Sequence, residues 1–287
     1  MLLALDVRNR AISVGFYERP STGIPGTGRW LSRRRLGAMP GRSADEYALL
    51  LGSLAAEARG PAAGGAVDAA WMSSVAPSLG RELGHAVESA FGLTCTVVGP
   101  GVKTGVRIRS DVPSEVGSDL ICAAAAAREL VGGACVVVDF DAAIAFSAVG
   151  RSGDFLGAAI APGLGTAAVA LRAMAAQLPE VPIEWSASGH AEDSGSAIGR
   201  NTAQAVRAGM VIGFAGLVER VVRRQSEELA AMGEADSPEA VTVLGTGDEE
   251  GRELFASLGL GRFIPELALE GIAIIAARAA PVRRTAV

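Results

Sequence analysis

Two stretches of this chain, residues 2–17 and residues 134–149, repeat one pattern. Each begins with an apolar run that ends at an aspartate, Asp6 in the first and Asp139 in the second, and continues into a second β-rich run. This pattern predicts a strand, a tight turn and a second strand in each copy. A further strand is predicted directly after the second copy, over residues 154–163. The repeat indicates an internal duplication, with one hairpin opening each half of the protein.

Helical signals follow each predicted hairpin. Residues 43–46, Ser-Ala-Asp-Glu, form a capping box in front of an apolar-periodic segment, so a helix should begin there. Further helices are predicted over residues 118–131, 201–229 and 267–278, short strands over 68–77, 95–101 and 241–244, and flexible loops over 18–36 and 230–240. Strands followed by helices, twice over, predict an α/β protein with two lobes facing one another across a central cleft.

Length and composition set further limits. A chain of 287 residues is comfortable for two lobes, and 49% apolar with 20% charged residues is typical of a globular protein. No apolar run is long enough for a membrane span, and Asp6 and Arg8 come too early for a signal peptide, so we expect a cytoplasmic protein without membrane contact. Three cysteines, Cys95, Cys122 and Cys135, lack CxxC spacing and are expected to be reduced core residues.

The charge pattern bears on possible partners. A net charge of −5 argues against bulk nucleic-acid affinity, although residues 29–35, Arg-Trp-Leu-Ser-Arg-Arg-Arg, are locally basic. We expect a solvated loop there, with nucleic-acid binding as the less favoured alternative. Neither His85 nor His190 lies in a motif with a nucleophile, so catalysis by histidine is not expected.

Three blocks of sequence point to a family. They are GPGVKTGVRIRSDVPSEVGSD at 99–119, AAIAPGLG at 158–165 and IGRNTAQAVRAG at 198–209. Together they resemble the type III pantothenate kinases, and weaker matches in the same order extend the resemblance over nearly the whole chain. The resemblance implies a duplicated actin-like, sugar-kinase-like fold with ribonuclease H-like lobes, here residues 1–117 and 118–287. It also implies a homodimer, with ATP bound between the lobes and pantothenate near the dimer interface.

The family's reaction transfers the γ-phosphoryl group of ATP to the primary hydroxyl of pantothenate, the first step of coenzyme A biosynthesis. Such a transfer needs a base at the hydroxyl, donors around the phosphates and metal ions that offset the negative charge. The resemblance therefore implies ATP with Mg²⁺ and a monovalent cation, K⁺, as cofactors. Asp139 matches the residue associated with that monovalent cation.

The family's base is the aspartate of a Gly-Ala-Asp-Arg string, which reads Gly117-Ser118-Asp119-Leu120 here. Asp119 is therefore the expected base, and a role as a helix cap, with the helix dipole keeping it ionised, stays open beside it. Leu120 cannot make the charge-assisted bond of the arginine it replaces. This change weakens the expected pantothenate site.

Two further positions match pantothenate contacts of the family. Ser110 stands where relatives commonly have tyrosine, which removes another contact. Thr202 matches the family's substrate-binding threonine, although a threonine before a helix can also be its cap. The pantothenate site is therefore expected to be only partly retained.

The first phosphate loop reads Asp6-Val7-Arg8-Asn9-Arg10, where relatives have Asp-x-Gly-Asn-Thr. Glycine lets the backbone approach phosphate closely, and threonine supplies a compact hydroxyl donor. The two arginines add positive charge but fill the space. They could also bind an anion of another shape.

Two further loops gain negative charge: the second phosphate loop, and a third loop that faces the adenosine side of ATP in relatives. Relatives have Asp-Phe-Gly-Thr-Ala-Thr-Thr where this chain has Asp139-Phe140-Asp141-Ala142-Ala143-Ile144-Ala145, and the family's Thr-Gly-Gly is Thr246-Gly247-Asp248 here. Two like charges about 4 Å apart repel by about 4 kcal/mol at an effective dielectric constant of 20. We therefore expect weakened ATP binding.

Three hypotheses follow. The leading one is a pantothenate-kinase-like protein that is catalytically impaired. The second is an active kinase with a rebuilt site, in which Arg8 and Arg10 offset phosphate charge and Asp119 acts as base. The third, from another class, is a regulatory accessory protein, whose only local support is the basic stretch at 29–35.

Overall fold

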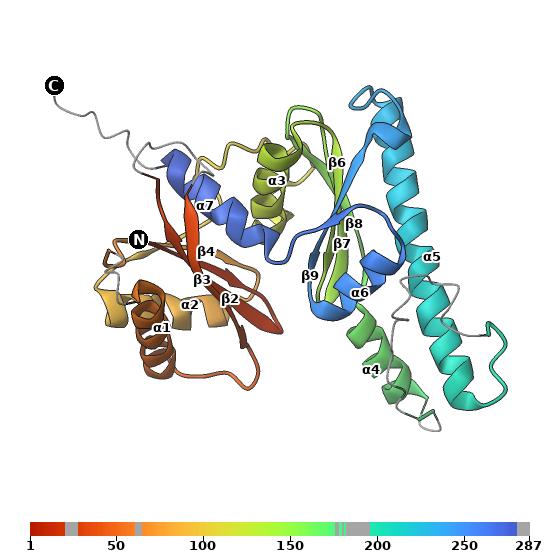
Figure 1. Cartoon of the computed structure of the whole chain (residues 1–287), viewed down its shortest axis with the longest axis horizontal. Helices are drawn as coiled ribbons and strands as arrows, with labels where there is room; N and C mark the ends of the chain where they lie inside the picture. Colours follow the sequence, from red (N-terminus) through yellow and green to blue (C-terminus); the bar gives the residue numbers. More distant parts are fainter. Residues whose placement is uncertain (21–27, 61–64, 176–177, 180, 182–195, 280–287) are drawn as a thin grey trace. The chain divides into compact units, whose positions relative to one another are not determined.

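The computed structural model describes the chain except residues 21–27, 61–64, 176–177, 180, 182–195 and 280–287 (Figure 1). Contacts divide it into two compact units, Met1–Leu130 with Glu266–Val287, and Val131–Pro265. This division differs from lobes that meet at residues 117 and 118, because the helix after residue 117 and the last helix pack with the first sheet. Each unit is described by itself below.

The first unit contains a five-stranded sheet in the order β3-β2-β1-β4-β5. Its strands are β1 (Leu2–Val7), β2 (Ala11–Glu18), β3 (Arg29–Gly37), β4 (Ala69–Ser74) and β5 (Cys95–Val97). The central strand β1 runs antiparallel to β2 and parallel to β4, and all six of its residues are buried. Burial on both faces explains why β1 reads as a nearly continuous apolar run.

The second unit contains a sheet in the order β10-β9-β6-β7-β8. Its strands are β6 (Cys135–Phe140), β7 (Ala143–Val149), β8 (Phe155–Pro162), β9 (Thr242–Gly247) and β10 (Arg262–Phe263). The central strand β6 is antiparallel to β7 and parallel to β9, as β1 is to β2 and β4. The two sheets share one topology, which confirms the predicted duplication and both predicted hairpins.

Helices cover both faces of the first sheet. They are α1 (Ala44–Arg59), α2 (Pro77–Phe91), α3 (Ser118–Val131) and α7 (Leu267–Ala279), and a short 3-10 helix, η1, spans Pro113–Glu115. One core lies under α1 and α2, and another joins the sheet to α3 and α7. The predicted capping box is present, since Ser43 and Glu46 exchange hydrogen bonds at the start of α1. A Cβ at Gly271 would lie 1.8 Å from the carbonyl oxygen of Cys122, so α7 and α3 meet where only glycine fits.

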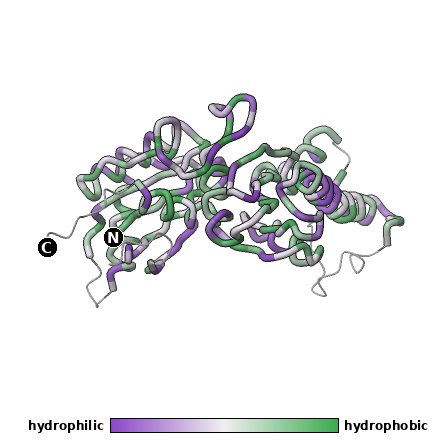
Figure 2. Tube along the Cα trace, turned by 90° about the horizontal axis from the view of Figure 1, so that it is seen from above, coloured by the Kyte–Doolittle hydropathy of each residue, from purple (hydrophilic) through white to green (hydrophobic). Residues whose placement is uncertain are grey.

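The second unit has its own helices, α4 (Leu164–Met174), α5 (Thr202–Ala231) and α6 (Glu249–Ser257), and the 3-10 helix η3 (Pro238–Ala240). Asn201 caps α5 by accepting a hydrogen bond from the backbone of Gln204. Hydrophobic and hydrophilic residues alternate along α5 (Figure 2). Its apolar residues, among them Val218 and Val222, join the core over β6 and β7, which explains how a helix of mixed polarity is held against the sheet.

The expected flexible loop at residues 18–36 is wrong for its described second half, which forms the edge strand β3. Its arginines are held by carboxylates: Arg29 pairs with Glu18 at 3.1 Å, Arg33 with Glu270 at 2.9 Å, and Arg34 with Glu57. These pairs offset the basic charge on which a nucleic-acid surface would depend. The second expected loop, 230–240, consists of the end of α5, a turn and η3.

The cysteines match their prediction, since Cys122 and Cys135 are buried, Cys95 is half-buried and all three are free. Within the described ranges, no helix combines the length and apolar character that a membrane span needs. Those same ranges contain no group of three or more histidine, cysteine or acidic side chains arranged to hold a metal ion. His190 lies outside the described residues, and His85 lies on α2.

Candidate active site

The first phosphate loop lies at the carboxyl end of β1. Asp6 is 3% exposed and Arg8 is 9% exposed, and Arg8 Nε donates to Asp6 Oδ2 at 2.7 Å. The backbone N–H of Arg8 donates to the carbonyl of Ala11, which closes the turn between β1 and β2. The turn thus folds the Arg8 guanidinium back onto the buried carboxylate. Asn9 and Arg10 lie exposed at the tip of the same turn.

A row of hydroxyls joins this point to helix α3. Asp6 lies opposite Ser73 in the register of β1 and β4, and Ser73 Oγ and Ser118 Oγ share a hydrogen bond of 3.0 Å. Ser118 Oγ also accepts from the backbone N–H of Ser74 at 2.9 Å. Ser118 therefore fixes the first residue of α3 to the end of β4, a role that the sequence did not indicate.

Asp119, the expected base, is the second residue of α3 and is half-buried. Its Oδ1 accepts from the backbone N–H of Leu120 at 2.9 Å. The helix begins with the N–H of Ile121 donating to the carbonyl of Gly117. Asp119 thus lies inside the first turn of α3, where a helix dipole favours an ionised carboxylate.

Asp6 and Asp119 both lie near the thiol of Cys122. Burial raises the pKa of the Cys122 thiol well above its usual value of 9, and the negative charges of Asp6 and Asp119 raise it further. A hydrogen bond with Ser73 and the positive charge of Arg8 act in the opposite direction. Cys122 therefore stays protonated and is no nucleophile. Its neighbours place a compact polar cluster at the carboxyl ends of β1 and β4.

Ser110 lies in the loop before η1 and is half-buried. Its Oγ is buried and makes no hydrogen bond to the residues that the structure describes.

In the second unit, Asp139 is the next-to-last residue of the central strand, as Asp6 is in the first. It is 3% exposed and lies opposite Thr246, which is fully buried, in the register of β6 and β9. Gly247, next along β9, has a φ of +119°, and a Cβ there would lie 1.9 Å from the carbonyl oxygen of Phe140. The third loop therefore needs glycine at position 247 in order to pass this close to the second loop.

The second phosphate loop is a tight turn closed by its neighbours. The backbone N–H of Asp141 donates to the carbonyl of Ala143, and the carbonyl of Ala142 accepts from Gly163 N at 3.0 Å and from Thr166 Oγ1 at 2.7 Å. A Cβ at Gly163 would lie 2.1 Å from the carbonyl oxygen of Asp141. The start of α4 is thus packed directly against this turn, a contact that the Pro-Gly-Leu-Gly string at 162–165 could have indicated.

Asp248, the added acid of the third loop, is the cap of helix α6. Its carboxylate accepts from the backbone N–H of Gly251 at 2.8 Å, and its own N–H donates to the carbonyl of Phe140 at 2.9 Å. The positive end of α6 is therefore already occupied by a carboxylate of the chain itself.

Thr202 is the first residue of α5 and is exposed. Its alternative role as a helix cap is wrong, because Asn201 caps α5. The Thr202 hydroxyl makes no hydrogen bond to any described residue. Within the second unit, Asp139, Thr246 and Gly247 thus lie together at the ends of β6 and β9. Thr202 lies separately, at the start of α5.

The sequence of the whole chain now decides the family. A model of the family described as type III pantothenate kinase matches residues 2–224. The chain belongs to the type III pantothenate kinase family. It is 36% identical over 279 residues to a type III pantothenate kinase of Dehalococcoides mccartyi strain CBDB1, covering 96% of this chain and 94% of that protein. It is also 36% identical to the type III pantothenate kinase of Streptomyces coelicolor, over 96% of this chain and 97% of that protein.

Solved structures agree with the fold of this family. A Campylobacter jejuni protein named for the Baf family of transcriptional activators matches with a TM-score of 0.55 at 15% identity, over 96% of this chain and 98% of that one. A Sinorhizobium meliloti protein named as a 2-dehydro-3-deoxygalactonokinase matches with a TM-score of 0.51 at 13% identity, over 100% and 98%. With the duplicated sheet topology, these matches confirm the actin-like, sugar-kinase-like fold.

Proposed function

We propose that this protein is a catalytically impaired member of the type III pantothenate kinase family, which keeps the fold but transfers phosphate from ATP poorly or not at all. The observation that carries the proposal is the Arg8–Asp6 ion pair at 2.7 Å, almost fully buried at the first phosphate loop. Relatives have glycine at position 8, which leaves room for a phosphate. Here a side chain of the protein fills that room, and the Asp6 carboxylate is already neutralised.

The second unit supports the same proposal. The turn at Asp141 and Ala142 offers no side-chain hydroxyl, and a phosphate approaching it would meet the Asp141 carboxylate. The start of α6 carries Asp248, Glu249 and Glu250, so this helix end repels an anion. Two loops thus present negative charge where the family binds a nucleotide.

These residues do not fit ATP with Mg²⁺ as the family uses them. Of the acids that could hold a cation at the first loop, Asp6 is bound to Arg8. Asp139 would be the ligand of a monovalent cation, and among the described residues it belongs to no group of three or more histidine, cysteine or acidic side chains.

The second candidate function, an active kinase, is favoured by one observation. Ser118 Oγ anchors the start of α3 to Ser74, which holds Asp119 in a fixed first helical turn. A base held this way could still accept the proton of the pantothenate hydroxyl. In that case Arg8 would have to leave Asp6 and bind phosphate.

Calorimetric titration of the full chain with Mg-ATP in potassium buffer, with and without pantothenate, separates the two candidates. Impairment predicts no binding tighter than about 1 mM, roughly −4 kcal/mol. Reversion of three positions to the residues of relatives, Arg8→Gly, Asp141→Gly and Asp248→Gly, is expected to restore nucleotide binding. The matched control is Arg10→Gly, which changes an exposed residue of the same turn.

A kinase assay gives the decisive result. Robust ATP-dependent phosphorylation of pantothenate by the wild-type protein, abolished in Asp119→Asn, would establish the active enzyme and overturn impairment. Equal and slow turnover by the wild type and Asp119→Asn would exclude Asp119 as the base.

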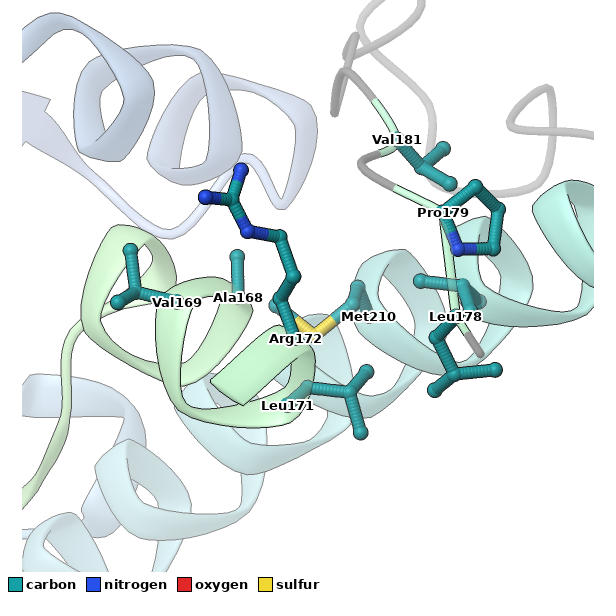
Figure 3. A pocket seen from close by; sticks show the side chains of 9 residues that line it. Ala168, Val169, Leu171, Arg172, Leu178, Pro179, Val181 and Met210 are labelled. Carbon is teal, nitrogen blue, oxygen red and sulfur yellow. The ribbon is translucent and has the colours of Figure 1, made fainter. Parts of the chain in front are cut away.

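We also propose a cytoplasmic homodimer, as in the family, formed through the α4 face of the second unit. Ile160 of β8 and Val169 and Met174 of α4 are 71%, 69% and 88% exposed. Beside them, a hollow of about 110 Å³ lies between Leu171 of α4, Met210 of α5 and the residues Leu178 and Pro179 (Figure 3). Val169→Glu with Met174→Glu should convert the dimer to monomers in analytical ultracentrifugation, whereas an unchanged mass would place the interface elsewhere.

A further inference from the structure

Helix α2 and the strands β4 and β5 line an open cavity of about 460 Å³ in the first unit. This volume lies within the range of small-molecule sites, roughly 300–1,000 Å³. Met72, which lines the cavity, belongs to the core under α1 and α2, whereas its neighbour Ser73 contacts Ser118 on the other side of the sheet. Neighbouring residues of a strand point to opposite faces, so the cavity is separate from the polar cluster around Asp6 and Asp119.

One wall of the cavity carries apolar side chains. Met72, which is buried, lines it together with Pro77 and Val97, which are exposed, Val97 at 50%. The polar residues Ser74, His85 and Thr94 also line the cavity. Cys95 completes this wall, and burial raises the pKa of its thiol to about 12. The thiol therefore stays neutral, so this wall suits an alkyl group and offers no covalent chemistry.

The rim of the cavity carries two opposite charges at a defined spacing. Arg81 and Glu88 of α2 both line the cavity and are exposed. Seven residues apart, they lie on one face of the helix, about 10 Å from one another along its axis. Neither side chain makes an ion pair or hydrogen bond with any residue that the structure describes. A cation and an anion thus remain available at the two ends of one hollow, with His85 of the same helix between them.

Two glycines of α2 line the cavity: Gly80, which directly precedes Arg81, and Gly84, which lies between the two charged residues. Packing explains the first, because a Cβ at Gly80 would lie 2.8 Å from Ser74 Oγ. At Gly84 a Cβ would meet nothing within 4 Å, so packing does not require glycine there. Glycine inside a helix is unfavourable relative to alanine. What Gly84 provides is open space in the cavity.

From this arrangement we infer that the cavity binds an extended aliphatic zwitterion, an ω-amino carboxylate. Its carboxylate binds Arg81, its ammonium group binds Glu88, and its alkyl chain lies against Met72 and Val97. Charge-assisted hydrogen bonds at both ends fix the direction of the ligand, and burial of the chain adds apolar contact. This site does not depend on whether the protein phosphorylates pantothenate.

The test is a calorimetric titration of the full chain with 8-aminooctanoate, compared with octanoate and octylamine, which each carry one of its two charges. We expect saturable binding of 8-aminooctanoate with a Kd below about 1 mM, at least about tenfold tighter than that of either comparison molecule. Absence of saturable binding overturns the site. Equal affinity for octanoate or octylamine overturns the choice of a zwitterion.

Variants locate the binding. Gly84→Leu fills the cavity, and Gly52→Leu is its matched control, because Gly52 lies inside α1 and a Cβ there also meets nothing within 4 Å. Gly84→Leu should abolish binding and Gly52→Leu should leave it unchanged. Binding that survives in Gly84→Leu shows that the ligand lies elsewhere.

The charged ends are tested at exposed positions, where folding is not at risk. Arg81→Gln and Glu88→Gln should each weaken 8-aminooctanoate binding at least about tenfold. Arg59→Gln, at an exposed arginine in the last turn of α1, is the control and should have no effect. An unchanged Kd in Arg81→Gln and Glu88→Gln contradicts the proposed orientation.

Discussion

The backbone N–H of Ser74 donates to Ser118 Oγ at 2.9 Å, and the same hydroxyl lies within 3.2 Å of the Ser74 carbonyl. One side chain therefore joins the end of β4 to the first residue of α3. The bond matters because the next residue of α3 is Asp119.

Ser118→Ala, which installs the residue of relatives, should destabilise this protein. The change leaves the buried Ser73 hydroxyl and the Ser74 N–H without a partner, so we expect a loss of about 1–3 kcal/mol in the free energy of unfolding. Urea denaturation measures it. Ser114→Ala, at an exposed serine of η1, is the control and should stay within about 0.5 kcal/mol of the wild type. A neutral Ser118→Ala would show that water replaces the hydroxyl.

Arg8→Gly should cost about 3 kcal/mol of stability, because it leaves the buried Asp6 carboxylate without its cation. The double variant Arg8→Gly with Asp6→Asn should recover much of that loss, since a neutral amide tolerates burial better than a lone charge. The exposed Arg10→Gly is the matched control for urea denaturation. If Arg8→Gly lowers the free energy of unfolding by less than about 1 kcal/mol, the ion pair does not stabilise this turn.

Asp248→Ala should lower stability by about 1 kcal/mol, because α6 loses the carboxylate that accepts the Gly251 N–H. Asp248→Gly, the residue of relatives, should cost only a few tenths of a kcal/mol, since glycine is tolerated at a helix cap. Thermal and urea denaturation of both variants check the order. A larger loss in the glycine variant would mean that Asp248 acts through something other than capping.

The duplication could be predicted from the sequence because each copy opens with a buried strand ended by an aspartate. Buried strands read as continuous apolar runs, and this signal is local. Caps, glycines or long apolar segments in the sequence also predict the helices α1, α3, α5 and α7. These signals fix which elements exist. They do not determine which elements pack together. Only the structure shows that α3 and α7 belong to the first unit.

The sequence missed three helices for physical reasons. α2 begins at Pro77 without a side-chain cap and contains Gly80 and Gly84, which lower helix propensity. α4 follows a Pro-Gly turn and is mostly exposed, and α6 has only nine residues. The arginines of β3 predict a solvent-exposed loop, whereas in the structure Arg33 and Arg34 are paired with acids distant in sequence. Such long-range pairs leave no local pattern.

For the site, sequence comparison identified the positions but not the contacts. That Arg8 turns back onto Asp6, and that Asp248 caps α6, follow from turn geometry that the residue types alone do not determine. The roles of Asp119, Thr202 and Asp139 toward substrate and cation remain predictions from the family.

Glu266 predicts a dependence of stability on pH. Burial raises the pKa of its carboxyl group, with Asp6 and Glu270 acting in the same direction and Arg33 and Arg35 opposing them. In the unfolded chain the group titrates near its usual value, so between that pH and the higher folded pKa the folded state holds more protons. Stability from this group is therefore complete at low pH and is lost as the pH rises through that window. Urea denaturation of Glu266→Gln should show a gain over the wild type that grows through the window and then levels off; a gain independent of pH would assign the effect to something other than titration.

The backbone at Glu266 gives a separate prediction. Its φ of +58° lies in the left-handed region, directly before α7, where a side chain costs about 1–2 kcal/mol and glycine costs little. Glu266→Gly and Glu266→Ala remove the same carboxylate, so comparing them isolates the backbone from the charge. Part of the advantage of glycine is offset by the greater freedom it gives the unfolded chain. We therefore expect the glycine variant to be more stable than the alanine variant by about 1 kcal/mol in urea denaturation at a single pH. Equal stability of the two variants would mean that the chain before α7 relaxes to a negative φ when the glutamate is removed.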